Sequence, residues 1–290
     1  MVPTFVRPSR TTVLSTSPYP TLKARIDSLI PEDLFPPAHL GIKIVSLTRN
    51  ETVYELNARA LFNPGSGQKL ITAATALTRL GGSFPLKTVV YMDASSNTLY
   101  LKGFGDALFQ TRDADSLAKL VRRMVSPARR WRLVGDISYF DDEYWGYGWN
   151  WNDEPEAYQM FITPLILNGN AIKLFARPGR KVGDPLIVWT EPQTSFVTIE
   201  NSGRTTARGV TTRLKLSRKY RERLNILTVE GEMMRRQRVD SAGLSLWQPE
   251  RYATHVFAER LQRAGLMVGE TGIDTVPATA FEIARFEHTL

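Results

Sequence analysis

The feature that most constrains this chain is an abrupt helix start at residues 63–69, N-P-G-S-G-Q-K, followed at once by an apolar stretch that runs to Leu80. Asn63 is of a residue type that caps helices, and the proline after it suits the first helical position because it has no N–H to leave unbonded. Gly81 supplies a typical end signal. The pattern therefore predicts a helix from residue 64 to residue 80.

Ser66 and Lys69 are three residues apart, so both side chains project from one face of the predicted first turn. A serine hydroxyl is a poor nucleophile until a base accepts its proton, and a desolvated lysine amine is one such base. The free N–H groups of a first helical turn also favour negative charge. The pair points to acyl transfer through a serine ester, and an ordinary helix N-terminus is the alternative interpretation.

The S-x-x-K pattern is too short to be specific, because Ser116 and Lys119 repeat it. This second copy lies within residues 113–125, whose leucines and valines recur at helical spacing, so we interpret it as part of a solvated helix face. Only Ser66 follows a Pro-Gly turn that opens an alanine-rich helix. Context, rather than the pattern itself, singles out Ser66.

Composition excludes several classes of protein. The 290 residues are 42% apolar and 23% charged, which is typical of a globular protein with one large domain or two modest ones. No apolar run reaches the length of a membrane-spanning helix, and the first twenty residues lack the apolar core of a signal peptide. The absence of cysteine excludes disulfides and thiolate catalysis.

The formal net charge of +8 raises the alternative of an acidic partner. Arginine and lysine cluster at residues 128–132, 218–223 and 235–238. Nucleic-acid or anionic-polymer surfaces use such clusters. Acidic residues are interleaved throughout, however, and no nucleic-acid-binding motif accompanies the clusters. We expect no nucleic-acid partner, and a mild preference for anionic surfaces stays open.

The patterning changes along the chain. A short helix is expected over residues 20–30 and a hairpin over residues 41–56, and a late helix is expected over residues 251–263. Between residues 83 and 245 short alternating runs dominate. The strands expected there are residues 86–92, 98–101, 133–140, 171–176, 186–189, 196–199, 210–216 and 226–229.

This order predicts an α/β (α+β) body interrupted by a large β-rich insertion. The expected divisions are a flexible tail at residues 1–19, a first part of the body at residues 20–82, the inserted domain at residues 83–245 and a return to the body at residues 246–290.

The helix start and three further segments form an ordered set. The helix start is N-P-G-S-G-Q-K-L-I-T-A-A at residues 63–74, and the others are L-K-G-F-G-D at 101–106, G-D-I-S-Y-F-D at 135–141 and T-P-L-I-L-N-G-N at 163–170. These segments resemble, in order and with similar spacing, the P-A-S-x-x-K-L-x-T-A, G-x-G-D, G-x-I-x-x-D and P-x-S-A-L-x-x-N-x-N runs of one family. It is the low-molecular-mass class C penicillin-binding proteins, the D-alanyl-D-alanine carboxypeptidase/endopeptidase family.

The resemblance covers most of residues 20–290 and implies a serine transpeptidase/β-lactamase-like fold. It also implies a serine-type hydrolase that acts on peptidoglycan stem peptides and binds β-lactams, in a periplasmic or other extracytoplasmic location. On this basis Ser66 is expected to be the nucleophile and Lys69 the general base. The Ser66 N–H would form half of an oxyanion hole. Lys69 would then need burial or a nearby positive charge to lose its proton.

Two further motifs of the fold, S-x-N and K-T-G, follow the insertion in this family, and neither stands there in residues 1–290. Residues 95–97 fit S-x-N formally but fall in a predicted hairpin turn. Residues 87–89 lack the glycine of K-T-G, and residues 270–272 carry the wrong charge. The sequence is therefore expected to be an N-terminal portion whose catalytic domain lacks its C-terminal part. A non-catalytic peptidoglycan-binding or scaffold fragment is the alternative.

The aromatic segment at residues 144–151 holds three of the six tryptophans of the chain. Aromatic planes beside acids suit an amphipathic ligand that ends in an amine. In the resembling family the equivalent loop helps to bind the diamino acid of the stem, which makes Trp151, Asp153 and Tyr158 candidate substrate-binding residues. The alternative is a lid that packs on the core of the insertion.

The three histidines His39, His255 and His288 are scattered without metal-ligand spacing. His255 is expected to be a packed or surface residue. Residues 103–105, G-F-G, lack the third glycine and the helix start of a nucleotide-binding loop. We expect no metal and no other cofactor.

Overall fold

The computed structural model describes residues 18–30, 39–150, 153–207 and 209–290. Contacts divide the chain into two compact units, residues 1–75 and 76–290, and each is considered by itself. A flexible tail was expected over residues 1–19, and residues 1–17 of it lie outside the described residues. No helix in the described ranges combines the length and the apolar character that crossing a membrane requires.

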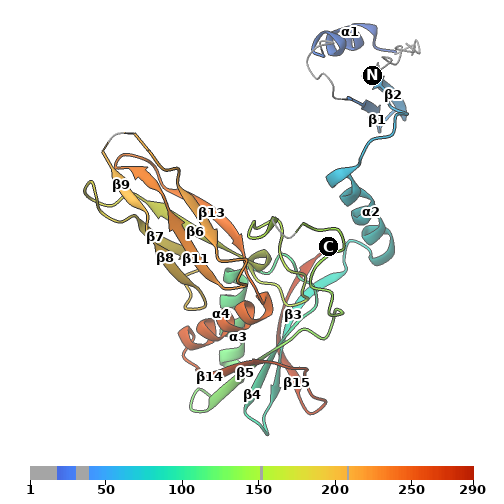
Figure 1. Cartoon of the computed structure of the whole chain (residues 1–290). Coiled ribbons are helices and arrows are strands. Elements are labelled where there is room, and N and C mark those ends of the chain that lie inside the picture. Colours follow the sequence, from blue (N-terminus) through green and yellow to red (C-terminus); the bar gives the residue numbers. More distant parts are fainter. Residues whose placement is uncertain (1–17, 31–38, 151–152, 208) are drawn as a thin grey trace, which may run out of the picture. The chain divides into compact units, whose positions relative to one another are not determined.

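Figure 1 shows the helices and strands with their labels. Those of the first eighty residues are α1 (Pro20–Ser28), β1 (Ile42–Ser46), β2 (Glu51–Leu56), the 3₁₀ turn η1 (Gly65–Gly67) and α2 (Gln68–Leu80). The next are β3 (Pro85–Asp93), β4 (Thr98–Gly103), α3 (Thr111–Met124), β5 (Arg130–Asp136), the 3₁₀ turn η3 (Asn168–Asn170), β6 (Ala171–Arg177) and β7 (Ile187–Glu191). The last are β8 (Thr198–Asn201), β9 (Arg204–Thr206), β10 (Lys215–Arg218), β11 (Ile226–Glu230), β12 (Glu232–Met234), β13 (Asp240–Ser245), α4 (Pro249–Arg263), β14 (Met267–Ile273) and β15 (Phe281–Thr289).

In the first unit, α1 is joined to the predicted hairpin, which forms as the antiparallel pair β1–β2. Tyr54 of β2 is only 2% exposed, and its hydroxyl donates a hydrogen bond to Asp27 Oδ1 of α1 at 2.8 Å. The Lys23 ammonium lies 5.6 Å from the centre of the same ring. One buried tyrosine therefore links the helix to the hairpin.

In the second unit, a five-stranded sheet has the order β14-β5-β4-β3-β15. Helices α3 and α4 lie against it, between the sheet and the remaining strands (Figure 1). The α3 sequence suits this place because Ala114, Leu117, Ala118 and Val121 recur at helical spacing, and all four are buried. Asp113 Oδ2 accepts the Gln110 N–H at 2.9 Å and closes the start of the helix.

The remaining strands form a β-rich lobe of three small sheets, with the orders β13-β6-β7, β10-β11-β8 and β12-β9. Along β6, Ile172, Leu174 and Ala176 alternate into the core, whereas Lys173 and Arg177 face outward. This period-two burial is what the sequence predicted for residues 171–176.

Residues 246–290 attach to the sheet of the second unit. Strand β14 pairs with β5 in parallel, and β15 pairs with β3 antiparallel along nearly its whole length. The expected boundary between residues 245 and 246 therefore cuts across one sheet, because the strands on its two sides share backbone hydrogen bonds. The division by contacts falls instead between residues 75 and 76, within α2.

Two strand predictions were wrong in extent. The strand expected over residues 133–140 ends at Asp136, because its carboxylate accepts the Ser138 N–H at 2.7 Å and turns the chain. The strand expected over residues 210–216 begins only at Lys215. Before it, Glu232 Oε2 accepts the Thr211 N–H at 2.7 Å and holds the residues around Thr211 in a loop.

Asp136 is fully buried, and its hydrogen bonds join three segments. Its Oδ2 accepts the Val276 N–H at 2.8 Å and the Lys102 ammonium at 3.1 Å, in addition to the Ser138 contact at Oδ1. Burial by itself would raise the pKa of this carboxyl. The hydrogen bonds from Val276, Ser138 and Lys102 outweigh that effect and hold the pKa of Asp136 below its usual range.

Gly103 ends β4 where another backbone passes very close. A Cβ atom at this position would lie 2.2 Å from the Pro164 carbonyl oxygen and 2.3 Å from Leu165 Cα. Both neighbours are backbone atoms and cannot rotate away. The L-K-G-F-G-D segment therefore needs glycine here so that residues 164–165 can cross the end of the sheet.

We expect Gly103→Ala to lower the free energy of unfolding by about 1–3 kcal/mol or more, because the added methyl group forces two backbones apart. Urea denaturation measures this change. In the matched control Gly82→Ala, the nearest atom to the new Cβ is Leu77 Cδ2 at 4.0 Å, and we expect a change within about 0.5 kcal/mol. Equal stability of the two variants would contradict the close approach.

The lowered pKa of Asp136 predicts a pH dependence of stability. Its contribution is present above the unfolded pKa of about 3.9 and is lost as the pH falls through the lower folded value. At pH 7, Asp136→Asn should cost about 1–3 kcal/mol of unfolding free energy. Urea titrations from pH 7 to pH 3 should show this difference shrinking below about pH 4. The exposed Asp142→Asn serves as control, and a pH-independent difference would contradict the assignment.

Candidate active site

The helix start predicted at residues 63–69 forms. The Asn63 side-chain oxygen accepts the Gly65 N–H at 3.2 Å, and the Gly67 N–H donates to the Pro64 carbonyl at 2.7 Å. Gly65 has a φ of 46°, a left-handed value that favours glycine. The first turn is the 3₁₀ turn η1, whose N-cap is Pro64 and not the predicted Asn63, and the α-helical part starts only at Gln68. Ser66 lies in the middle of η1.

Ser66 and Lys69 stand on two successive turns, Ser66 in η1 and Lys69 at the second position of α2. Both are exposed, as is every residue from 61 to 71. Burial was one of the two conditions under which Lys69 could act as a base, and the first unit does not provide it. The described residues of the first unit contain no side chain that buries Lys69, so the roles of Ser66 and Lys69 stay predictions.

The apolar side chains of α2 explain what kind of surroundings this helix needs. No residue of the helix is buried, and Leu70, Ile71, Leu77 and Leu80 are between 49% and 76% exposed. A stripe of this size on one helix is typical of a surface that packs against other structure.

The candidate substrate-binding residues belong to the other unit. Trp151 lies outside the described residues. Asp153 is partly buried, and its N–H donates to the Asn150 carbonyl at 3.1 Å. Tyr158 is 70% exposed. Ser66 falls in residues 1–75 and these two in residues 76–290, so they belong to units that are each considered by themselves.

A buried ion pair, which no local sequence pattern signals, holds the loop that carries Asp153. Arg218 of β10 is 2% exposed and forms a salt bridge with Glu154. Its guanidinium also donates to the Leu224 carbonyl at 3.1 Å. Burial lowers the pKa of Arg218, and the Glu154 charge opposes that shift. Breaking a buried pair leaves an uncompensated charge, so this contact strongly favours one loop position.

The aromatic segment is partly packed, in agreement with the lid alternative. Trp145 lies 5.1 Å from Phe161, and Phe161 lies 5.1 Å from Trp247, as measured between ring centres. Tyr147 and Trp149, in contrast, are 93% and 41% exposed. The segment therefore combines a packed base with exposed aromatic rings.

Two of the formal motif matches, residues 95–97 and the second S-x-x-K copy, lie where the sequence predicted. Residues 95–97 form the turn between β3 and β4, where Asp93 accepts the Ser95 N–H at 3.0 Å. Ser116 and Lys119 are both exposed on α3, and the Ser116 hydroxyl donates to the Arg112 carbonyl at 3.0 Å. This confirms the interpretation of the second S-x-x-K copy as a solvated helix face.

The G-x-G-D segment ends in a carboxylate that contacts the last strand. Asp106 is 1% exposed and accepts the Leu108 N–H at 3.1 Å. The His288 ring of β15 lies with Nδ1 2.8 Å from Asp106 Oδ2 and with Nε2 4.0 Å from Asp113 Oδ2. These residues are far apart in sequence, and the scattered histidines gave no sign of the contact. His288 therefore holds the edge strand β15 against the start of α3.

The N-G-N run at residues 168–170 forms a turn of left-handed backbone conformation. Asn168, Gly169 and Asn170 all have positive φ values, between 52° and 62°, which asparagine and glycine tolerate best. The Asn168 amide donates to the Tyr252 hydroxyl at 3.0 Å, and its oxygen accepts the Thr111 N–H at 2.9 Å. Burial raises the pKa of Tyr252 to about 12, so its hydroxyl stays protonated in this contact.

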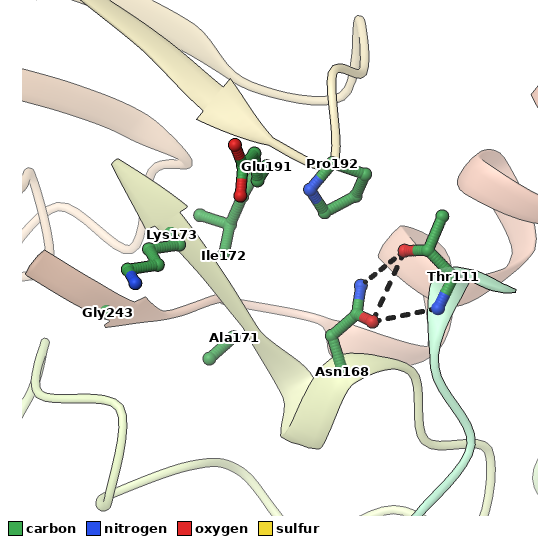
Figure 2. Close-up of a pocket in the computed structure, with 8 residues that line it drawn as sticks. All are labelled: Thr111, Asn168, Ala171, Ile172, Lys173, Glu191, Pro192 and Gly243. Atoms are coloured by element: carbon green, nitrogen blue, oxygen red, sulfur yellow. Dashed lines mark hydrogen bonds between the residues drawn. The ribbon is translucent and has the colours of Figure 1, made fainter. Parts of the chain in front are cut away.

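A groove of about 500 Å³ lies beside Asn168, and Figure 2 shows the residues that line it. Lys173 and Glu191 are register partners on β6 and β7, and both line it. Neither Asp153 nor Tyr158 is among its lining residues. The groove offers one cation and one anion at the base of the lobe, and sequence reasoning missed it because its walls come from α3, β6, β7 and β13.

A serine, a histidine and a glutamate also meet at the surface of the second unit. Ser195 Oγ lies 2.8 Å from His255 Nε2, and Glu259 Oε1 lies 3.3 Å from the same nitrogen. In a catalytic triad the acid binds the other ring nitrogen, so this arrangement cannot relay a proton to the serine. Glu259 also accepts the Ser195 N–H at 2.8 Å, which identifies the cluster as a loop anchor.

Comparison with known proteins accounts for the ordered motifs. The chain is 27% identical over 270 residues to a D-alanyl-D-alanine carboxypeptidase of Actinomadura sp. (strain R39), covering 89% of this chain and 50% of that protein. It is 24% identical over 262 residues to a penicillin-sensitive carboxypeptidase A of Dictyostelium discoideum, covering 81% of this chain and 49% of that protein. The chain thus spans about half the length of the curated relatives it matches.

The fold is that of a solved structure, penicillin binding protein 4 from Haemophilus influenzae. The two agree with a TM-score of 0.68 at 17% sequence identity, over 91% of this chain and 58% of the other. A second structure of that protein, in complex with a β-lactam, matches with a TM-score of 0.61 at 14% identity, over 91% of this chain and 57% of the other. The predicted mixed α/β fold of the transpeptidase/β-lactamase type is confirmed by this likeness.

The family itself is shown by a match over nearly the whole sequence. Residues 22–287 fit the family described as D-Ala-D-Ala carboxypeptidase 3 (S13), which confirms the resemblance inferred from the motifs. The chain therefore belongs to the D-Ala-D-Ala carboxypeptidase 3 (S13) family of peptidases.

Proposed function

We propose that this chain supplies the nucleophilic part of a serine-type D-alanyl-D-alanine carboxypeptidase/endopeptidase that acts on peptidoglycan stem peptides and binds β-lactams. The observation that carries the proposal is the S-x-x-K pair Ser66 and Lys69 on a formed helix start, within a chain of the S13 family. The names of the matched relatives, carboxypeptidases and a penicillin-binding protein, support it. An extracytoplasmic location, where peptidoglycan is found, belongs to the same proposal.

In the proposed reaction, Ser66 Oγ attacks the carbonyl carbon of the penultimate D-Ala and Lys69 Nζ accepts its proton. The C–N bond to the terminal D-Ala breaks, and the leaving amine takes up that proton. Water then attacks the Ser66 ester and releases the shortened stem. A β-lactam would follow the first half of this path, with its ring amide as the bond that breaks.

The exposure of the pair sets a condition on this chemistry. A lysine that acts as a base requires desolvation or a neighbouring cation, and Lys69 is exposed in the described residues. The proposal therefore requires that the apolar stripe of α2 be covered in the active protein, so that the amine of Lys69 lies in a partly closed cleft.

We assign the aromatic segment a part in the same function. Trp151, Asp153 and Tyr158 would bind the diamino acid of the stem, with the Asp153 carboxylate facing its amine. The exposed rings of Tyr147 and Tyr158 on a loop fixed by the Arg218–Glu154 pair support this assignment.

A second candidate function is binding of peptidoglycan without catalysis. The exposure of Ser66 and Lys69 in the described residues favours it. In that case the lobe and the aromatic segment would bind stems, and Ser66 would be an ordinary residue of a helix start.

Incubation with a fluorescent penicillin tests the nucleophile. We expect a covalent adduct that survives denaturation and that Ser66→Ala abolishes, because the acyl group is attached to Oγ. Ser116→Ala is the matched control, since it removes the serine of the second S-x-x-K copy and should leave labelling unchanged. Retained muropeptide binding without any adduct would establish the non-catalytic alternative.

The stem-binding assignment is tested separately by calorimetry with a muropeptide that carries a free diamino-acid amine. We expect Asp153→Asn to weaken binding about tenfold, because one charge-assisted hydrogen bond worth about 1.5 kcal/mol is lost. Asp142→Asn, an exposed acid at the edge of the same segment, should have no effect. An unchanged affinity of Asp153→Asn would remove this residue from the site.

A further inference from the structure

Three segments come together at the end of the β-rich lobe that lies farthest from α3 and α4 (Figure 1). They are residues 177–186, the described residues of 204–215 (204–207 and 209–215) and 230–240, and we name this region the distal tip. The Thr205 carbonyl accepts the Gly183 N–H at 2.8 Å, and the Thr206 carbonyl accepts the Arg235 N–H at 2.9 Å. These cross-links fix the loops as one surface.

The distal tip is strongly cationic. Nine arginine and lysine side chains of its described residues are exposed: Arg177, Arg180, Lys181, Arg204, Arg213, Lys215, Arg235, Arg236 and Arg238. Within the part of the chain that the structure describes, the salt bridges lie elsewhere, and none of the nine has a carboxylate oxygen within 4.0 Å. The charge of these side chains is therefore directed to the solvent.

Four carboxylates share this region, and three of them are held by backbone N–H groups. Asp184 Oδ2 accepts the Lys181 N–H at 2.9 Å, and Asp240 Oδ1 accepts the Ser241 N–H at 2.8 Å. Glu232 Oε2 accepts the N–H groups of the 211–212 loop, and these hydrogen bonds lower its pKa. The fourth carboxylate is Glu230. Three of the acids thus stabilise the loops, and the region keeps an excess of positive charge.

The tips of these loops also expose apolar side chains. Val182 is 54% exposed, Val210 41%, Met234 41% and Val239 51%, and three of the four adjoin an arginine or lysine in the sequence. The three segments contain no aromatic residue. Surfaces that bind single-stranded nucleic acid use aromatic rings for base stacking. Cations around exposed aliphatic side chains suit a bilayer, where the apolar groups enter the headgroup region.

We propose that the distal tip binds the surface of a membrane rich in anionic phospholipid, with its arginines and lysines at the headgroups and its valines and Met234 at the acyl boundary. This function is independent of Ser66 and would place the second unit at a membrane without a spanning helix.

Co-sedimentation of the 290-residue chain with vesicles tests the proposal. We expect binding to phosphatidylglycerol/phosphatidylcholine vesicles, a steep loss between 50 and 500 mM salt, and little binding to pure phosphatidylcholine. Arg235→Glu with Arg236→Glu should lower the partition coefficient by more than about 25-fold, because each cation near an anionic surface contributes about fivefold. Val182→Ser with Val239→Ser should lower it by about fivefold or more.

The matched control is Lys119→Glu with Arg123→Glu, which changes the net charge equally on the exposed face of α3 and should leave binding within about twofold. Circular dichroism verifies that each variant is folded. Equal losses in the tip and control variants would overturn the proposal, since net charge alone would then explain binding. Binding to polyphosphate or DNA but not to the vesicles would also overturn it, in favour of an anionic polymer.

Discussion

The second unit depends on the pairing of its last strand with its first. Strand β15 lies antiparallel to β3, and β14 lies parallel to β5, so residues 267–289 complete a sheet begun almost two hundred residues earlier. The long excursion between these strands, which contains the β-rich lobe, is therefore closed by backbone hydrogen bonds at its base. Contacts of high sequence separation of this kind form at a high entropic cost, so the buried helices α3 and α4 must offset it.

Buried polar contacts then fix how the loops leave this sheet. Asp136 joins β4, the end of β5 and the segment before β15, and the Asp106–His288 contact joins the start of α3 to β15. The Arg218–Glu154 pair holds the loop of the aromatic segment. Each contact gives a buried carboxylate or guanidinium its partners, so removing one partner would leave a buried polar group unpaired. The motifs shared with the S13 family thus include residues with structural roles as well as the S-x-x-K pair.

Some features of the candidate active site depend on neighbouring residues in the sequence, and others depend on contacts with distant segments. The helix start at residues 63–69 formed because the hydrogen bond from the Gly65 N–H to Asn63 Oδ1, a glycine at φ 46° and an apolar helix are local features. The activation of Lys69 is not local, since it depends on what surrounds α2, and the described unit leaves that helix exposed. The position of the loop that carries Asp153 and Tyr158 is likewise not local, because a distant arginine holds it through Glu154.

By itself, the sequence determined the family, the mixed α/β fold, most helices and strands, and the nature of the second S-x-x-K copy, because periodicity, caps and ordered motifs are written in neighbouring residues. Only the tertiary structure decided that residues 246–290 complete the sheet of the second unit and that Gly103 is required by a crossing backbone. It alone gathered the loop cations into one distal tip. These outcomes depend on which distant segments meet, and a hydrogen bond or a steric contact between them leaves no mark in local sequence.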